Sequence, residues 1–320
     1  PIEHGEVFVT HDGGETDLDL GYYERFANIQ VSKRNSTSSG KLLDQLLKEE
    51  RKGVYLGKTI TMFPHFTNCI KEFIYQDEDK YNIIICEIGG SAGDYEANAF
   101  LETIRQIKQE RGSSRVLICA LSYLVYYDAT KELKTKPTQV AIRQLMMAGV
   151  DPDILLLRSE HTIDDTIKQK IANYTNIRKE HIISAYNVTS IYQVPLEYVR
   201  EGLLDSLQNQ LNLPEINTIP PVSLRSKLQP WIRLNWQIKG CRHKIRLALV
   251  GKYMELEDSY YSVIEAIQHA GWYYSTTVEI VFVNARDQKT TLEQLREVHC
   301  ILVPGGFGTT GMESIITAIT

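Results

Sequence analysis

The sequence has few cysteines, no long apolar run and no excess of positive charge. Its 320 residues include five cysteines with no C-x-x-C pair, which argues against a disulfide framework and is typical of a reducing, cytoplasmic environment. No 18-residue apolar stretch and no signal peptide are present, so we expect neither a membrane span nor a membrane partner. The net charge of −5 argues against a bulk nucleic-acid binder, so any nucleotide site must come from local clustering.

The sequence also shows no cluster of histidines and cysteines with the spacing of a metal site. The eight histidines are dispersed, and only His299 lies beside a cysteine, Cys300. Because no third partner is visible nearby, a nucleophilic pair is not expected there. The composition, with 43% hydrophobic and 23% charged residues, is that of an ordinary globular protein.

Apolar strands alternate with helices along most of the chain, which predicts an α/β fold with a parallel sheet. Prolines interrupt this pattern between residues 213 and 244, so we predict a linker there, with a short helix near residues 231–236. A second α/β unit is expected from Ile245 onward. The expected strands are 82–88, 115–121, 154–157, 181–184, 245–250, 278–283 and 300–303, and the expected helices are 97–110, 138–148, 164–174, 259–270 and 292–297.

An acidic segment near the start of the chain is a candidate metal site. Glu15, Asp17 and Asp19 alternate, so an extended backbone would put all three carboxylates on one side. Carboxylates in that arrangement repel each other unless a cation lies between them, and Mg²⁺ takes such oxygen ligands. A solvated acidic loop is the alternative, and the segment alone does not decide between the two.

The next candidate is Glu87, at the carboxyl end of the apolar segment predicted to be a buried strand. Ligands bind outside the carboxyl ends of parallel strands, and a carboxylate there needs a partner or a cation. Glycines follow, and then Asp94 and Glu96 lie where a helix is expected to begin. These two acids either contact a ligand or simply complement the helix dipole.

The segment Lys134-Thr135-Lys136-Pro137-Thr138-Gln139 precedes a predicted helix. Two lysines around a hydroxyl at a helix N-terminus are typical of a phosphate-binding loop, and Lys170 on the next helix could add a cation. A solvated basic loop is the alternative. Glycine turns also follow the strands at 245–250 and 300–303, where Gly305 and Gly306 either form an oxyanion hole or only turn the chain.

Taken together, these segments resemble the CTP synthases in order and spacing, over essentially the whole chain. The resemblance implies a parallel-sheet, P-loop-type amidoligase domain at 1–213, an interdomain linker at 214–244, and the first part of a class I glutaminase α/β domain at 245–320. The matching strings are 1–10, 16–21, 23–26, 55–59, 87–90, 93–94, 134–139, 190–192, 250–253 and 303–308.

The activity implied by this resemblance is the ATP-dependent amination of UTP to CTP, with ammonia from glutamine. The implied cofactors are Mg²⁺ and ATP, with GTP as a candidate allosteric activator and CTP as a feedback inhibitor. A homotetramer is implied, because the pyrimidine nucleotide bridges subunits in this family.

The resemblance also assigns roles to individual residues. Asp19 and Glu87 would hold Mg²⁺ between the ATP phosphates, with Asp17 beside them, and Arg158 and Val188 would lie near the adenine. Pro1, His4 and Val7 would line the ammonia passage, and Gly305 and Gly306 would form the oxyanion hole. The residues implied to bind UTP or CTP are Asp94, Tyr95, Glu96, Lys134, Thr135, Lys136, Gln139 and Lys170.

The chain departs from the family pattern at its ends and at scattered positions. The family's phosphate loop precedes the residue that is Pro1 here, and its nucleophilic cysteine follows Thr320, so we expect this polypeptide alone to make little or no CTP. The alternative function is a truncated, non-catalytic protein that binds UTP or CTP or assembles with a complete paralogue. The departures that affect the adenine contact, the GTP response and the glutaminase lid are at Thr61, Asn187, Thr189, Thr309 and Thr310.

Overall fold

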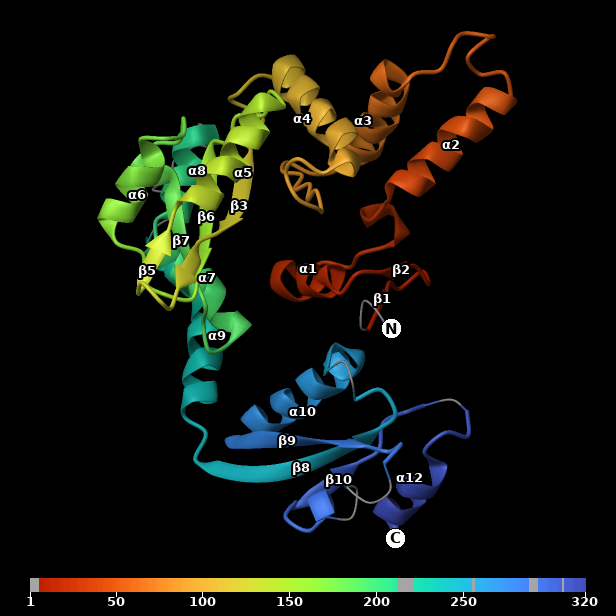
Figure 1. Cartoon of the computed structure of the whole chain (residues 1–320), viewed down its shortest axis with the longest axis vertical. Helices are drawn as coiled ribbons and strands as arrows, with labels where there is room; N and C mark the ends of the chain where they lie inside the picture. Colours follow the sequence, from red (N-terminus) through yellow and green to blue (C-terminus); the bar gives the residue numbers. More distant parts are fainter. Residues whose placement is uncertain (1–5, 212–220, 255–256, 288–292, 307) are drawn as a thin grey trace. The chain divides into compact units, whose positions relative to one another are not determined.

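The computed structural model describes residues 6–211, 221–254, 257–287, 293–306 and 308–320. The chain forms two compact units (Figure 1). The central unit consists of residues 38–232, and the terminal unit combines residues 1–37 with residues 233–320. The domain boundaries predicted near residues 213 and 245 stay a prediction.

A parallel three-stranded sheet forms the middle of the central unit. Its strands are β3 (Cys119–Tyr123), β6 (Ile154–Ser159) and β7 (Ile182–Tyr186), in the order β3-β6-β7. Parallel neighbours need a crossover, and helices α5 (Lys136–Met147) and α6 (Asp165–Ala172) supply the two crossovers. The core of this unit is apolar and includes the fully buried Leu155, Leu157 and Ile171. The predicted α/β fold with a parallel sheet is therefore confirmed.

A short antiparallel hairpin, β4 (Val125–Tyr127) and β5 (Glu132–Lys134), lies between β3 and α5 in the chain. The part of the central unit before β3 is helical and has its own apolar cluster, which includes Leu46, Phe66 and Ile70. The helices of this part are α2 (Ser39–Arg51), η2 (Met62–Phe66), α3 (Thr67–Tyr75), η3 (Tyr95–Ala97) and α4 (Asn98–Arg111). After β6 come η4 (Lys179–His181), η5 (Ile191–Gln193), α7 (Val194–Arg200) and α8 (Leu203–Leu211).

The strand predicted at residues 82–88 does not form, so this prediction is wrong. The segment is irregular, and the side chain of Ile85 is 91% exposed. A strand needs hydrogen bonds and side-chain contacts from a neighbour, and no strand of the described residues pairs with this segment. An apolar run shows what a segment could bury, but it does not supply the partner.

The terminal unit contains a second parallel sheet, in the order β10-β8-β9. Its strands are β8 (His243–Gly251), β9 (Thr276–Asn284) and β10 (Cys300–Leu302), and its helices are η7 (Glu257–Tyr260), α10 (Tyr261–Tyr273) and α12 (Met312–Ile319). The helix expected at 292–297 begins outside the described residues, and residues 293–295 are helical. The N-terminal segment of this unit holds β1 (Phe8–Val9), β2 (Glu15–Thr16), α1 (Asp19–Ala27) and η1 (Lys33–Asn35).

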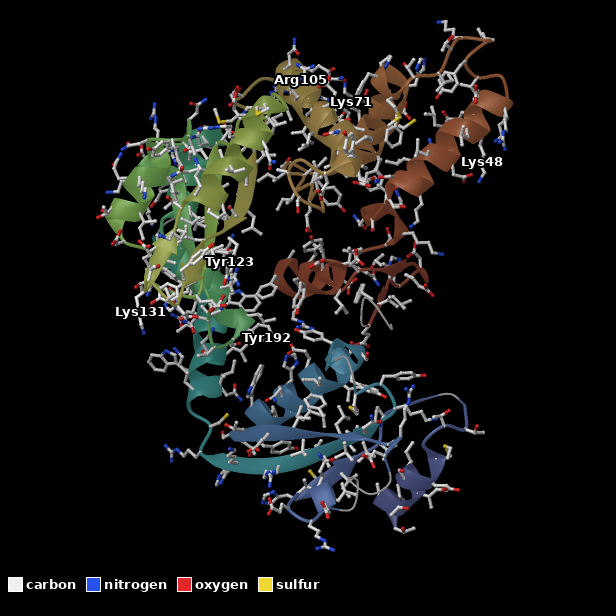
Figure 2. All side chains as sticks on the ribbon, in the orientation of Figure 1. Lys48, Lys71, Arg105, Tyr123, Lys131 and Tyr192 are labelled. Atoms are coloured by element: carbon white, nitrogen blue, oxygen red, sulfur yellow. The ribbon has the colours of Figure 1, made fainter. Side chains whose placement is uncertain are left out.

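The short helix expected near residues 231–236 is part of a longer helix, α9 (Pro221–Lys239). A proline at the start of a helix loses no intrahelical hydrogen bond, so Pro221 suits its position. The Trp231 ring stacks on the ring of Tyr192, which is labelled in Figure 2, at a centroid distance of 6.0 Å. Of the helices that the structure describes, none combines the length and the apolar character needed to cross a membrane.

An ion pair on α4 leads to a testable pH dependence. Arg105 donates two hydrogen bonds to Glu102, at 2.7 and 2.8 Å, and this pairing is the main reason why the pKa of Glu102 falls to about 2. A lowered pKa stabilises the fold above the unfolded-state pKa of about 4.3, and this contribution is lost as the pH falls through about 2.

We therefore expect Glu102→Gln to lower the free energy of unfolding at pH 7 by about 1 kcal/mol or less, since both side chains are partly in water. The difference from the wild type should shrink steadily below about pH 4, as measured by chemical denaturation. Glu50→Gln, at an exposed acid on α2, is the matched control. A difference that does not change with pH would contradict the assignment.

Candidate functional site

The loop that begins α5 is held at the carboxyl end of β3. The Ser122 hydroxyl donates to Thr138 at 3.2 Å, and the Thr138 hydroxyl is 3.4 Å from the carbonyl oxygen of Tyr123. Lys136 is the first residue of α5 and is exposed, and Pro137 follows it in the first turn. The start of α5 therefore lies where parallel α/β sheets bind ligands, as the sequence predicts.

The side chains of this loop differ in their exposure. Thr135 is the N-cap residue and is buried, as is Gln139, whose amide donates to the Thr135 hydroxyl at 3.1 Å. Gln139 therefore also supports the loop from inside. Lys134 is half-buried and Lys136 is exposed, so both lysines are more accessible than Thr135 and Gln139.

An acid that sequence reasoning missed lies among the lysines. Glu132, two residues before Lys134 on β5, forms an ion pair with the Lys134 ammonium. The pKa of Glu132 is lowered chiefly by this hydrogen bond, and the charge of Lys170 on α6 contributes to the lowering. The structure therefore pairs Lys134 with Glu132, and Lys170 is near enough for its charge to influence that carboxylate. We call these three residues with Lys136 the basic cluster.

Aromatic side chains of β3 and β4 make polar contacts close to the basic cluster in the chain. The Lys134 ammonium lies 6.0 Å from the centroid of the Tyr127 ring, a weak cation–π contact. The Tyr123 hydroxyl donates to Glu160 at 3.0 Å, and Lys131 projects outward from the turn of the hairpin (Figure 2). The position of Glu132 two residues before Lys134 could have signalled their pairing, because residues i and i+2 of a strand lie on the same face.

The glycine turn before α4 folds around Asp94. An oxygen of Asp94 accepts the backbone N–H of Ser91 at 2.9 Å, and Gly90 and Gly93 both have positive φ angles. A side chain at Gly93 would come within 3.2 Å of Gln144, which lies on α5. The turn therefore approaches the helix whose first residue belongs to the basic cluster. Tyr95 and Glu96 follow it, and both are exposed.

Arg158, at the end of β6, ties down the turn that follows β7. Its guanidinium donates to the carbonyl oxygens of Ala185 and Tyr186, at 3.1 and 3.3 Å, and to the side-chain oxygen of Asn187 at 2.8 Å. Val188 comes next in the chain and is half-buried. Arg158 therefore has a clear structural role, because it orders the backbone on which Val188 lies.

The acidic segment of the terminal unit does not continue as one extended strand. Only Glu15 and Thr16 form strand β2, and Asp19 is the first residue of helix α1, so the expected alternation through Asp19 is wrong. A helix begins there because the N-terminal end of the helix dipole favours an acid in its first turn. Asp17 and Asp19 are both exposed carboxylates.

Carboxylate oxygens of this kind suit Mg²⁺, which prefers hard oxygen ligands. Glu87 is likewise exposed, but it belongs to the central unit, whereas Asp17 and Asp19 belong to the terminal unit. Within the described part of the chain, no three His, Cys, Asp or Glu side chains gather closely enough to hold a metal ion. The metal ligands stay a prediction.

Two glycine turns of the terminal unit are joined by Lys252, another residue whose role the sequence did not show. Its ammonium donates to the carbonyl oxygen of Gly308 at 2.6 Å, and its backbone N–H donates to the Tyr260 hydroxyl at 3.0 Å. The Lys252 side chain is buried. This contact connects the turn after β8 with the turn that contains Gly305 and Gly306, which are both exposed.

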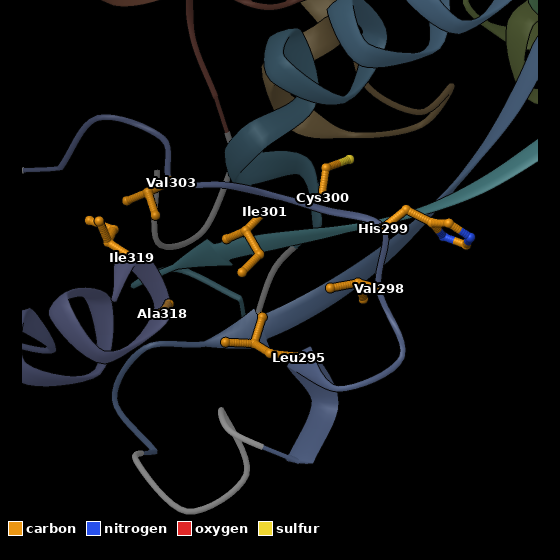
Figure 3. Close-up of a pocket in the computed structure, with 8 residues that line it drawn as sticks. All are labelled: Leu295, Val298, His299, Cys300, Ile301, Val303, Ala318 and Ile319. Carbon is orange, nitrogen blue, oxygen red and sulfur yellow. The ribbon is translucent and has the colours of Figure 1, made fainter.

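Of the three residues expected along an ammonia passage, Pro1 and His4 lie outside the described residues. Val7 directly precedes β1, and its side chain is 42% exposed. A cavity of about 470 Å³ in the terminal unit is lined mainly by apolar side chains of β10, α12 and the segment before β10 (Figure 3). None of the predicted site residues lines this cavity, so we assign it no role in the candidate site.

Sequence comparisons point to a single family. A family model described as the CTP synthase N-terminus matches residues 1–213. The CTP synthase of Cereibacter sphaeroides is 44% identical over 320 residues, covering 99% of this chain and 57% of the relative. The CTP synthase of Caldanaerobacter subterraneus subsp. tengcongensis is 42% identical over 323 residues, covering 100% of this chain and 59% of the relative. The chain thus spans somewhat more than half the length of these curated relatives.

The pairing of Glu132 with Lys134 gives a testable prediction. Glu132→Gln removes the negative charge that competes with an anion, so affinity for inorganic tripolyphosphate should rise about threefold at low salt. Isothermal titration calorimetry measures the change, and added salt should reduce it. Glu297→Gln, at an exposed acid paired with Arg246, is the matched control. Weaker binding in the Glu132 variant would show that this acid supports the cluster instead.

Proposed function

The chain belongs to the CTP synthase family, and from that premise we propose that it takes part in the ATP-dependent amination of UTP to CTP with ammonia from glutamine. The observation that carries the proposal is the basic cluster at the start of α5. Lys134 is paired with Glu132, Lys170 adds a positive charge that influences the same carboxylate, and Lys136 is the first residue of the helix. Cations at a helix N-terminus are well suited to a triphosphate.

We propose that UTP places its phosphates at the basic cluster and its base toward the Asp94 turn. Gly93 approaches Gln144 on α5, so the turn and the cluster share one helix. Asp94, Tyr95 and Glu96 would then contact the pyrimidine nucleotide, with the exposed Tyr95 ring available for stacking. Buried Gln139 would support the site indirectly, because its amide donates a hydrogen bond to the Thr135 hydroxyl. The product CTP would bind the same groups, which accounts for feedback inhibition.

For the phosphoryl transfer, we propose Asp19 and Glu87 as Mg²⁺ ligands, with Asp17 close to the ATP phosphates. Bound Mg²⁺ would neutralise the charge that develops on the transferred phosphate. The protein's own contribution is positioning, which dominates catalysis of phosphoryl transfer. Arg158 would order the turn that meets the adenine at Val188, because it already holds that turn through two backbone carbonyls.

For the ammonia supply, we propose that the second α/β unit is the start of a glutaminase domain. Gly305 and Gly306 would offer backbone N–H groups to the oxyanion, with Lys252 holding their turn. Pro1, His4 and Val7 would line the passage to UTP, which must exclude water because water competes with ammonia for the activated pyrimidine. GTP as an activator and a homotetrameric assembly are proposed from family membership alone.

The proposal predicts a specific kinetic defect in the protein expressed from its complete reading frame. Lys136→Ala should raise the KM for UTP about tenfold, because one charge-assisted phosphate contact is lost. The KM for ATP and the rate of glutamine hydrolysis should stay close to those of the wild type. CTP formation is followed by absorbance, with UTP, ATP, Mg²⁺ and either glutamine or ammonium as substrates. Lys179→Ala, at a half-buried lysine paired with Asp165, is the control.

One outcome would count against amination by this protein, and another against the basic cluster as its UTP site. If the wild type forms no CTP but still binds UTP or CTP, the non-catalytic alternative is favoured. Co-purification with a complete paralogue would then be the next measurement. If the wild type forms CTP and Lys136→Ala leaves the KM for UTP unchanged, the basic cluster is not the UTP site.

A further inference from the structure

Helices α1 and α10 lie side by side in the terminal unit, although about 240 residues separate them in the sequence (Figure 1). The Tyr22 hydroxyl on α1 is hydrogen-bonded to the Tyr261 hydroxyl on α10. The Arg25 guanidinium lies 3.1 Å from a carboxylate oxygen of Glu265. We call these four residues the α1–α10 clamp.

The spacing of the clamp residues fits one face of each helix. Tyr22 and Arg25 are three residues apart, and Tyr261 and Glu265 are four apart, so each pair lies on a single helical face. The two tyrosine rings meet edge-on, with centroids 6.2 Å apart and planes at 65°. The Arg25 guanidinium also lies 5.7 Å from the centroid of the Tyr22 ring, so the contacts support one another.

The clamp is partly shielded from water, which distinguishes it from an ordinary surface ion pair. The Glu265 side chain is 17% exposed and the Arg25 side chain is 35% exposed. Burial, followed by the contact with Tyr22, raises the pKa of the Tyr261 hydroxyl well above its usual range, so this group stays protonated. Such partly desolvated contacts have larger energies than fully exposed pairs.

Glu265 also approaches His269, one turn further along α10, at 3.6 Å. Burial lowers the pKa of His269 despite the opposing effect of Glu265, so His269 is mainly neutral at pH 7. Arg25 is therefore the permanent cation that meets Glu265. This makes the charge pair between the two helices more important than the pair within α10.

A third contact joins the N-terminal segment to the start of α10. The Glu6 carboxylate accepts the backbone N–H of Ser262 at 2.6 Å. The first N–H groups of a helix have no partner within the helix, and the dipole favours an anion there. Glu6 therefore stabilises the beginning of α10 from a distant part of the sequence, and it is the residue directly before Val7.

These contacts hold two parts of the chain that have proposed roles. Asp19, the proposed metal ligand, precedes Tyr22 by three residues and so lies on the clamp face of α1. Helix α1 also packs closely on β1, because a Cβ at Gly21 would come within 2.9 Å of the Phe8 ring. Movement of α1 on α10 would therefore displace both Asp19 and the strand that follows Val7.

We propose that helix α10 is a docking surface that positions the segment from Glu6 to Ala27, and that the α1–α10 clamp couples ammonia supply to UTP amination. This inference rests on the proposed function for its second part only. Tyr22, Arg25, Tyr261 and Glu265 are positioning residues, since they act through the backbone that carries Val7 and Asp19. Loss of the clamp leaves glutamine hydrolysis intact but lets ammonia escape before it reaches UTP.

The first experiment tests the docking alone, on the 320-residue chain, by hydrogen exchange and mass spectrometry. Arg25→Met and Glu265→Gln should each speed exchange in peptides covering α1 by about tenfold, because local opening becomes easier. The charge swap Arg25→Glu with Glu265→Arg should restore slow exchange. Glu297→Gln, at an ion pair elsewhere in the same unit, should leave α1 unchanged. Unchanged exchange in both single variants would overturn the inference.

The second experiment tests the coupling, on the protein expressed from its complete reading frame. For Glu265→Gln, CTP formed per glutamate released should fall at least about threefold. Glutamine hydrolysis should stay within about twofold of the wild type, and the rate with saturating ammonium should fall less than the rate with glutamine. The charge swap should restore the ratio. An unchanged ratio in a variant with faster exchange at α1 would overturn the coupling.

The two experiments separate this inference from the proposed function. If the wild type makes no CTP, the proposed function and the coupling fail together. The exchange result then still decides whether α10 positions the N-terminal segment. If CTP is made and only the exchange prediction fails, the proposed function stands and the docking surface is wrong.

Discussion

Parallel pairing of β6 with both β3 and β7 is the constraint on which the central unit depends. Parallel neighbours require each strand to return through a crossover, so the turns after all three strands open at the same edge of the sheet. Lys134 and Lys136 follow β3 through the hairpin, Arg158 is the penultimate residue of β6, and the turn that it holds follows β7. One rule of strand geometry therefore brings separate parts of the chain to a single edge.

The positive charge of the lysines at that edge is partly balanced by a carboxylate of the same chain. Glu132 pairs with Lys134 and is also influenced by Lys170, so the lysines have a carboxylate partner within the chain. A bound phosphate would exchange with that carboxylate, so the cluster can stay ordered without a ligand. Such an exchange reduces affinity but keeps like charges from repelling one another. Specificity then depends on the supporting residues, such as buried Thr135 and Gln139, which fix the start of α5.

The terminal unit shows a different principle, because it is assembled from the two ends of the sequence. Residues 6–37 contribute mainly one helix and a two-stranded ribbon, which is too little to bury a core independently. Their contacts with helix α10 of the second α/β unit give them a stable support. Through Glu6, Tyr22 and Arg25, the support is polar and directional rather than only apolar. Helix orientation is therefore set by contacts that can be removed one at a time.

Local sequence patterns determined the α/β class, the strands of both parallel sheets, the helices α4, α5, α6 and α10, and the position of the basic loop at the start of α5. These features follow from local rules, namely apolar runs, helical periodicity and a proline in the first turn. Tertiary structure alone decided that residues 82–88 stay unpaired, because a strand depends on a neighbour that no local pattern supplies. It also decided that the charge of Lys170 reaches Glu132 and that α1 meets α10, since both depend on residues that are distant in the sequence. Local sequence patterns specify individual helices and strands, whereas the contacts between them form only when the chain folds.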